Sequence, residues 1–168
     1  MNSSELEEEP SAQPRGFVRE GFVAGLIGAV VVAAWFLLVD VIAGRPFFTP
    51  AVLGSAVFFE LRDPTEVTIS VQAILAYTSI HIVAFVGVGV AAAAILKDAE
   101  KNRGVLWLAL EFFIAIELGF YAVVALVFMP LLAELAWFNV AAGNLIAAGA
   151  MGYYFVRVHP MLRKGLLQ

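Results

Sequence analysis

Three long runs without a charged residue constrain this sequence more than any other feature. Residues 21–39, 67–96 and 135–156 contain no Asp, Glu, Lys or Arg over 19, 30 and 22 positions. A helix needs roughly 20 mainly apolar residues to cross the hydrocarbon core of a bilayer. Each run meets that length, so these runs alone predict three membrane spans.

The composition excludes an ordinary soluble domain. Hydrophobic residues make up 62% of the chain and charged residues 14%, with a mean hydropathy of +0.91. Soluble domains carry about 45–50% apolar and about 25% charged residues. The absence of cysteine leaves no disulfide or thiolate metal site. The net charge of −4, mostly in the N-terminal tail, argues against nucleic acid as a partner.

A fourth span is predicted between residues 104 and 129, although two glutamates interrupt it. The distribution of Lys and Arg supports this span, because these residues accumulate on the cytoplasmic side of a membrane. With four spans, both termini lie on the same side of the membrane. That side carries eight basic residues, and the opposite side carries two. The eight are Arg15, Arg19, Lys97, Lys101, Arg103, Arg157, Arg163 and Lys164, and the two are Arg45 and Arg62.

The sequence therefore predicts an all-α integral membrane protein, folded as a four-span antiparallel helix bundle. The location expected is the plasma (inner) membrane, multi-pass, with the N- and C-termini cytoplasmic. Residues 1–16 are expected to form a disordered acidic cytoplasmic tail, because they are rich in Glu, Ser and Pro. Residues 17–157 form the four-helix transmembrane domain, and residues 158–168 form a basic cytoplasmic tail.

The segment between the first two spans predicts a short interfacial or re-entrant helix. Residues 50–61 are apolar but too short to cross a membrane. Thr49 and Pro50 have the residue types of an N-cap and a first helical position. Gly44 suits the end of the preceding span.

The second span is predicted to begin near Pro64. Asp63, Pro64 and Glu66 have the spacing of a capping box at a helix start. A helix from there to Leu96 would be roughly 50 Å long. Such a helix would have to tilt or protrude from the bilayer.

Three predicted spans each carry a polar group near mid-membrane depth. Counting 1.5 Å per residue from the span ends brings His81, Glu117 and Asn144 to similar depths. Tyr77 precedes His81 by one helical turn, and Tyr121 follows Glu117 by one turn. These five residues define the predicted intramembrane polar cluster, in which Glu117 approaches His81. Such a cluster either specifies helix packing or takes part in function.

The remaining acids of the spans are expected to lie nearer the membrane surfaces. Glu111 is six residues from Glu117, so the two lie about 120° apart on a helix and cannot form a close pair. Glu111 is a secondary intramembrane acid, expected to point towards the cytoplasmic interface. Asp40 and Glu134 are expected to be solvated near the outer interface.

The glycines in the spans predict close helix packing. Gly21, Gly25 and Gly28 follow a small-residue face of the first span, and Gly87 and Gly143 are each followed by an alanine four residues on. Small residues at this spacing let helix backbones approach closely in a membrane. The contact is expected within the bundle, or as a homodimer seam on Gly21 and Gly25.

No motif identifies a catalytic site, and no cofactor or metal is predicted. The chain has two histidines and lacks the Glu-x-x-His repeat of a di-iron bundle. The favoured function is a non-enzymatic accessory or scaffold component with a polar core. A transporter or proton-relay protein using the cluster is the alternative, and a membrane-embedded metal or redox subunit is a third. The expected partners are the lipid bilayer and a homodimer or larger membrane complex.

Overall fold

The computed structural model describes residues 15–61, 63–99, 111–112, 114–116, 118–119, 122 and 137–159. Its regular elements are α1 (Arg15–Ile42), α2 (Phe48–Phe58), the 3₁₀ helix η1 (Pro64–Glu66), α3 (Val71–Ala99) and α6 (Trp137–Val158). The described residues between 111 and 122 are also helical. The prediction of an all-α chain is confirmed for these residues.

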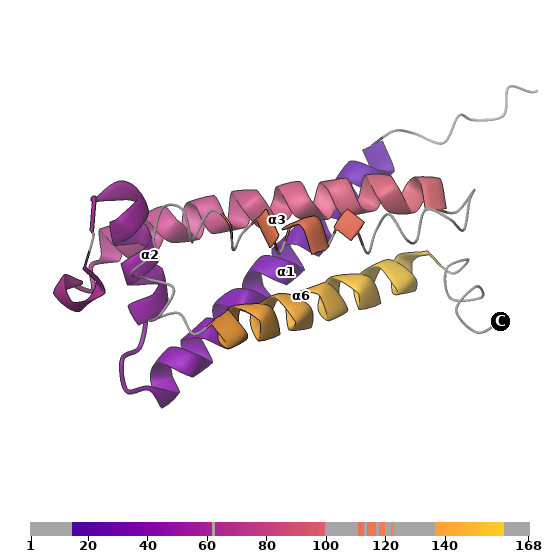
Figure 1. The fold of residues 1–168 in the computed structure, drawn as a ribbon. Coiled ribbons are helices and arrows are strands. Elements are labelled where there is room, and N and C mark those ends of the chain that lie inside the picture. Colours follow the sequence, from indigo (N-terminus) through magenta and orange to yellow (C-terminus); the bar gives the residue numbers. More distant parts are fainter. Residues whose placement is uncertain are drawn as a thin grey trace, which may run out of the picture.

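α1 runs in the opposite direction to both α3 and α6 (Figure 1). Glu20, near the start of α1, accepts a hydrogen bond of 3.0 Å from His159, the residue directly after α6. Lys97, near the end of α3, lies over the ring of Phe17 at 5.3 Å from its centroid. The start of α1 and the ends of α3 and α6 therefore share one end of the molecule. The chain leaves α3 at this end and re-enters α6 at the other.

α1 and α3 cross with their backbones in direct contact. A Cβ added to Gly89 would lie 2.5 Å from the nitrogen of Gly25 and 2.8 Å from its Cα, and a Cβ added to Gly21 would lie 2.7 Å from the oxygen of Gly89. A side chain larger than hydrogen therefore does not fit at these positions. Because α3 covers this face of α1, the face is not open to a second copy of the chain.

Two further glycines lie where α6 meets its neighbours. A Cβ added to Gly28 of α1 would lie 2.6 Å from the sulfur of Met151 on α6, and one added to Gly143 of α6 would lie 2.8 Å from the Trp35 ring of α1. The Trp35 indole N–H also donates to the Asn139 carbonyl at 2.9 Å. These contacts join α6 to α1 where Gly28 and Gly143 leave room for a side chain of the other helix.

Gly87 does not take part in this packing. It is exposed, and an added Cβ would meet no atom of the described residues within 4 Å. No described helix packs against Gly87, so its role in helix packing stays a prediction. Two residues along a helix correspond to a rotation of about 200°, so Gly87 faces away when Gly89 faces α1.

α1 ends where the sequence predicted, in a Schellman motif at Gly44. Gly44 has φ +72° and donates its N–H to the Val41 carbonyl at 3.0 Å, while the Arg45 N–H donates to the Asp40 carbonyl at 2.9 Å. These two bonds satisfy carbonyls that the last helical turn leaves open. The left-handed conformation at Gly44 is the reason that glycine suits this position.

One carboxylate joins α2 to the end of α1. Asp40 is 3% exposed, and its two oxygens accept hydrogen bonds from the Thr49 N–H at 2.8 Å and the Thr49 hydroxyl at 2.7 Å. Two predictions are wrong here, because Thr49 lies inside α2 rather than capping it, and Asp40 is buried rather than solvated. The preceding helix supplies the acceptor that the first turn of α2 needs.

α3 begins later than predicted. It starts at Val71 instead of near Pro64, and Ser70 acts as its N-cap by accepting a hydrogen bond from the Ala73 N–H at 3.2 Å. The helix still has 29 residues, roughly 43 Å, which exceeds the hydrocarbon thickness of a bilayer.

The capping pattern before α3 closes a local turn instead of starting the long helix. One carboxylate oxygen of Asp63 accepts hydrogen bonds from the Thr65 N–H at 2.9 Å and the Thr65 hydroxyl at 2.7 Å. These bonds favour the charged form and hold the pKa of the exposed Asp63 carboxyl below its ordinary value. The turn leads into η1, and the chain is then extended up to Ser70.

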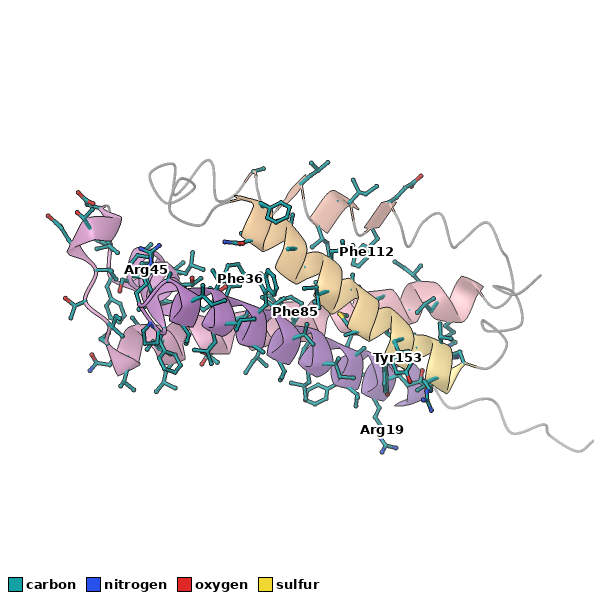
Figure 2. All side chains as sticks on the ribbon, turned by 90° about the horizontal axis from the view of Figure 1, so that it is seen from below. Arg19, Phe36, Arg45, Phe85, Phe112 and Tyr153 are labelled. Carbon is teal, nitrogen blue, oxygen red and sulfur yellow. The ribbon has the colours of Figure 1, made fainter. Side chains whose placement is uncertain are left out.

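The outward faces of the two longest helices are apolar. The segments Gly16–Ile42 and Val71–Lys97 are long enough to cross a membrane, and their most apolar 18-residue windows have mean hydropathies of 2.7 and 2.3. Only 28% and 17% of their apolar windows are buried. Figure 2 shows side chains projecting outwards along these helices, with Arg45 towards one end and Arg19 and Tyr153 towards the other. The described residues thus contain two helices that could span a membrane.

Candidate functional site around His81

His81 lies on α3 and is fixed by a contact to α1. Its Nε2 is 3.1 Å from the Ala29 carbonyl oxygen. A carbonyl oxygen can only accept a hydrogen bond, so the proton of the neutral ring resides on Nε2. Nδ1 is then a hydrogen-bond acceptor, and no hydrogen bond to it is recorded among the described residues.

Aromatic rings hold His81 on both sides along α3. The Tyr77 ring stacks on it with 5.5 Å between centroids, and the Phe85 ring lies 4.8 Å away at a tilt of 52°. These residues are spaced four apart, so they follow one face of the helix. The His81 ring is therefore positioned by three contacts and has little freedom to rotate.

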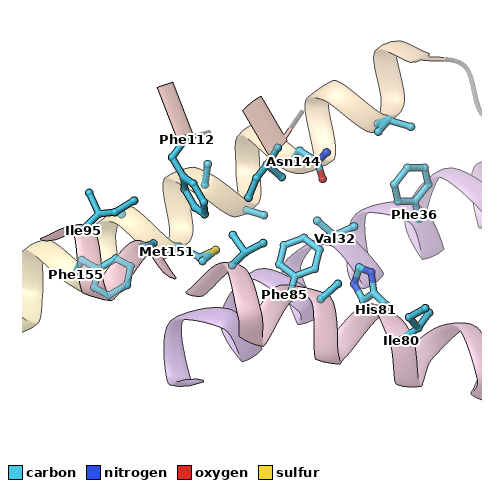
Figure 3. A pocket seen from close by; sticks show the side chains of 18 of the residues that line it. Val32, Phe36, Ile80, His81, Phe85, Ile95, Phe112, Asn144, Met151 and Phe155 are labelled. Atoms are coloured by element: carbon cyan, nitrogen blue, oxygen red, sulfur yellow. The ribbon is translucent and has the colours of Figure 1, made fainter. Parts of the chain in front are cut away.

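A cavity of about 490 Å³ lies along this face of α3. It is bounded by α1, α3 and α6, by Leu53 of α2, and by Phe112 and Ile116 from the described residues between 111 and 122. Figure 3 shows His81 and Phe85 from α3 on one side and Asn144 and Met151 from α6 on the other. The residues recorded in its wall are apolar except for Tyr77, His81 and Asn144. We call this the inner cavity.

A second cavity of about 330 Å³ lies between α1, α2 and α3, and we call it the outer cavity. Asp40 and Thr49 border it, together with apolar residues of α1. Tyr77 and His81 line both cavities. Together with Val32 and Phe36, which also line both, these two side chains lie between the inner cavity and the outer cavity bordered by Asp40 and Thr49.

The structure brings three residues of the predicted polar cluster to one cavity. Tyr77 and His81 reach the inner cavity from α3, and Asn144 reaches it from α6. Glu117 and Tyr121 lie outside the described residues, so the approach of Glu117 to His81 stays a prediction. Within the described part, Nε2 of His81 has the Ala29 carbonyl as its partner.

Glu111 is separate from this cavity. Its side chain is exposed, whereas the next residue, Phe112, lines the inner cavity. The expected direction of Glu111 towards the cytoplasmic interface stays a prediction.

Two polar contacts between distant elements were not predicted. They are the Asp40–Thr49 bonds and the His159–Glu20 contact, which ties the end of α6 to the start of α1. The sequence did contain a signal for the Asp40–Thr49 bonds, namely an aspartate within a predicted apolar span that is followed by a short helix. No local pattern signals the second, because 139 positions separate its partners.

No group of three or more His, Asp or Glu side chains that could hold a metal ion occurs among the described residues. Comparisons with protein-family profiles, curated proteins and solved structures give no match for this chain. Its function must therefore be argued from its own geometry.

Proposed function

We propose that this chain is a non-enzymatic integral membrane protein that serves as an accessory or scaffold component of a larger membrane assembly. The observation that carries the proposal is the low burial of α1 and α3, of whose apolar windows only 28% and 17% are buried. Apolar surface of this extent requires cover by lipid or by another protein. Val83 on α3 and Leu145 on α6 are 69% and 65% exposed.

The proposed topology has four spans in the inner membrane, with both termini cytoplasmic. The parallel course of α3 and α6 supports an additional crossing between them, since the chain leaves one end of the molecule and re-enters at the other. The excess of Lys and Arg on the terminal side, eight against two, supports the orientation. α2 then lies at the outer end of the bundle.

Site-specific photo-crosslinking in native membranes tests the accessory role. A photoreactive residue at Val83 or Leu145 is expected to give an adduct of one defined mass with a second membrane protein. The same residue at Thr65, in the polar turn before α3, serves as the control and is expected to give no such adduct. Lipid adducts alone from both Val83 and Leu145 would contradict the proposal.

A proton relay is the second candidate, because Tyr77 and His81 line both cavities and Asp40 borders the outer one. The relay predicts proton uptake by proteoliposomes that is lost in His81→Phe, which keeps an aromatic ring but cannot carry a proton. The accessory role predicts no uptake by either protein.

A further inference from the structure

The inner cavity has the chemistry of a site for an apolar ligand. The described part of its wall is formed mainly by aliphatic and aromatic side chains. Away from Tyr77, His81 and Asn144, the described wall offers water no side-chain hydrogen-bond partner, which favours an apolar occupant there. Its volume of about 490 Å³ lies within the range of small-molecule sites.

The shape of the cavity favours an extended ligand. The lining residues of α3 run from Tyr77 to Leu96, and those of α6 run from Val140 to Phe155. The nineteen steps along α3 correspond to roughly 28 Å. Because the cavity volume of about 490 Å³ extends along this part of α3, the cavity is narrow. A narrow cavity suits one hydrocarbon chain better than a compact ring system.

The polar residues of the cavity select the head group of such a ligand. They lie towards the start of α3, where Nδ1 of His81 has no donor among the described residues. Asn144 and Tyr77 can each donate to a ligand oxygen. A hydroxyl group donates and accepts at once, whereas an ether oxygen only accepts.

We propose that the inner cavity binds one long-chain lipophilic alcohol, with its hydroxyl group between His81 and Asn144 and its chain directed towards Leu96 and Phe155. This ligand site goes beyond the accessory role and does not depend on it. The proposed ligand also differs from a bilayer lipid whose acyl chain fills the inner cavity, because an acyl chain cannot donate a hydrogen bond to Nδ1 of His81.

Photo-crosslinking of the full chain in phosphatidylcholine nanodiscs tests the proposal. The probe is cetyl alcohol carrying a diazirine, and the competitors are unlabelled cetyl alcohol and its methyl ether. The alcohol is expected to compete roughly two- to twelvefold better than the ether, the ratio that corresponds to one net hydrogen bond. Equal competition by both compounds would overturn the proposal, as would the absence of saturable crosslinking.

Substitutions within the chain locate the site. Ala148→Leu fills the cavity from α6 and is expected to weaken probe binding roughly tenfold or more. Ala150→Leu, the same change on the same helix but outside the recorded cavity wall, is the control and is expected to bind normally. Equal binding by these two variants would overturn the location.

His81→Phe tests the hydrogen bond separately. Phenylalanine keeps a ring between Tyr77 and Phe85 but offers no acceptor, so the preference for alcohol over ether is expected to fall to about one, given the size of one hydrogen bond. An unchanged preference would overturn the role of His81. Because Ala148→Leu is tested on the native His81, the site remains testable even where His81→Phe does not fold.

Discussion

Replacing Gly89 with alanine is expected to destabilise the bundle by about 2 kcal/mol relative to the same replacement at Gly87. The added Cβ at position 89 would lie 2.5 Å from the nitrogen of Gly25 and 2.8 Å from its Cα. Backbone atoms of a helix cannot move aside as a flexible side chain can. α1 and α3 must therefore separate along their whole contact.

The variant Gly87→Ala is a matched control on the same helix. Both variants gain the same intrinsic preference of alanine for the helical state, so this term cancels in the difference between them. An added Cβ at Gly87 meets no atom of the described residues within 4 Å. The measurement is the free energy of unfolding in mixed micelles, and equal values for the two variants would contradict the crossing of α1 and α3 at Gly89.

Replacing Asp40 with alanine is expected to cost about 3 kcal/mol, since hydrogen bonds to charged groups are strong and buried donors left without acceptors are penalised. Both oxygens of Asp40 accept from Thr49, and the carboxylate is 3% exposed. The variant leaves the N–H and the hydroxyl of Thr49 without their acceptor. The first turn of α2 is then expected to detach from α1.

Asp63 provides the control, because it makes the same pair of bonds to the N–H and hydroxyl of a threonine, Thr65. Asp63 is fully exposed, so water can replace its bonds. Asp63→Ala is expected to leave the unfolding transition unchanged. Amide hydrogen exchange at Thr49 should accelerate in Asp40→Ala alone, and similar behaviour of the two variants would refute a stabilising role for the buried carboxylate.

The long helices could be predicted from the sequence because their signal is local. The charge-free runs located α1 and α3, and Gly44 marked the end of α1, since a left-handed residue is needed there. The start of α3 was predicted seven residues too early, at Pro64 instead of Val71. The pattern at Asp63 can either start a long helix or close a single turn. Nothing in the local sequence distinguishes these two outcomes.

Contacts between elements could be predicted only in part. Gly87 and Gly89 have the same local pattern, each with an alanine four residues on, and the residues around both are apolar. Hydrophobic periodicity therefore could not tell which of the two meets α1. Asp40 escaped prediction for a related reason, because its partner Thr49 comes from the next helix and its burial depends on how α2 folds back.

The candidate site illustrates the same limit. An estimate of depth grouped His81 with Asn144, and the structure has both residues at the inner cavity. The estimate could not give the bond from His81 to the Ala29 carbonyl, because any helix carbonyl at that depth is an equivalent acceptor in the sequence. The assignment of Nδ1 as an acceptor without a donor among the described residues follows only from that bond.

Labelling of single cysteines in intact cells tests the proposed topology most directly, because the native chain has no cysteine. The proposal predicts that a membrane-impermeant maleimide labels Thr65→Cys in intact cells. Arg19→Cys and Lys164→Cys should react only after the cells are permeabilised. Labelling of Arg19→Cys in intact cells would contradict the orientation, and opposite behaviour of Arg19→Cys and Lys164→Cys would contradict four spans.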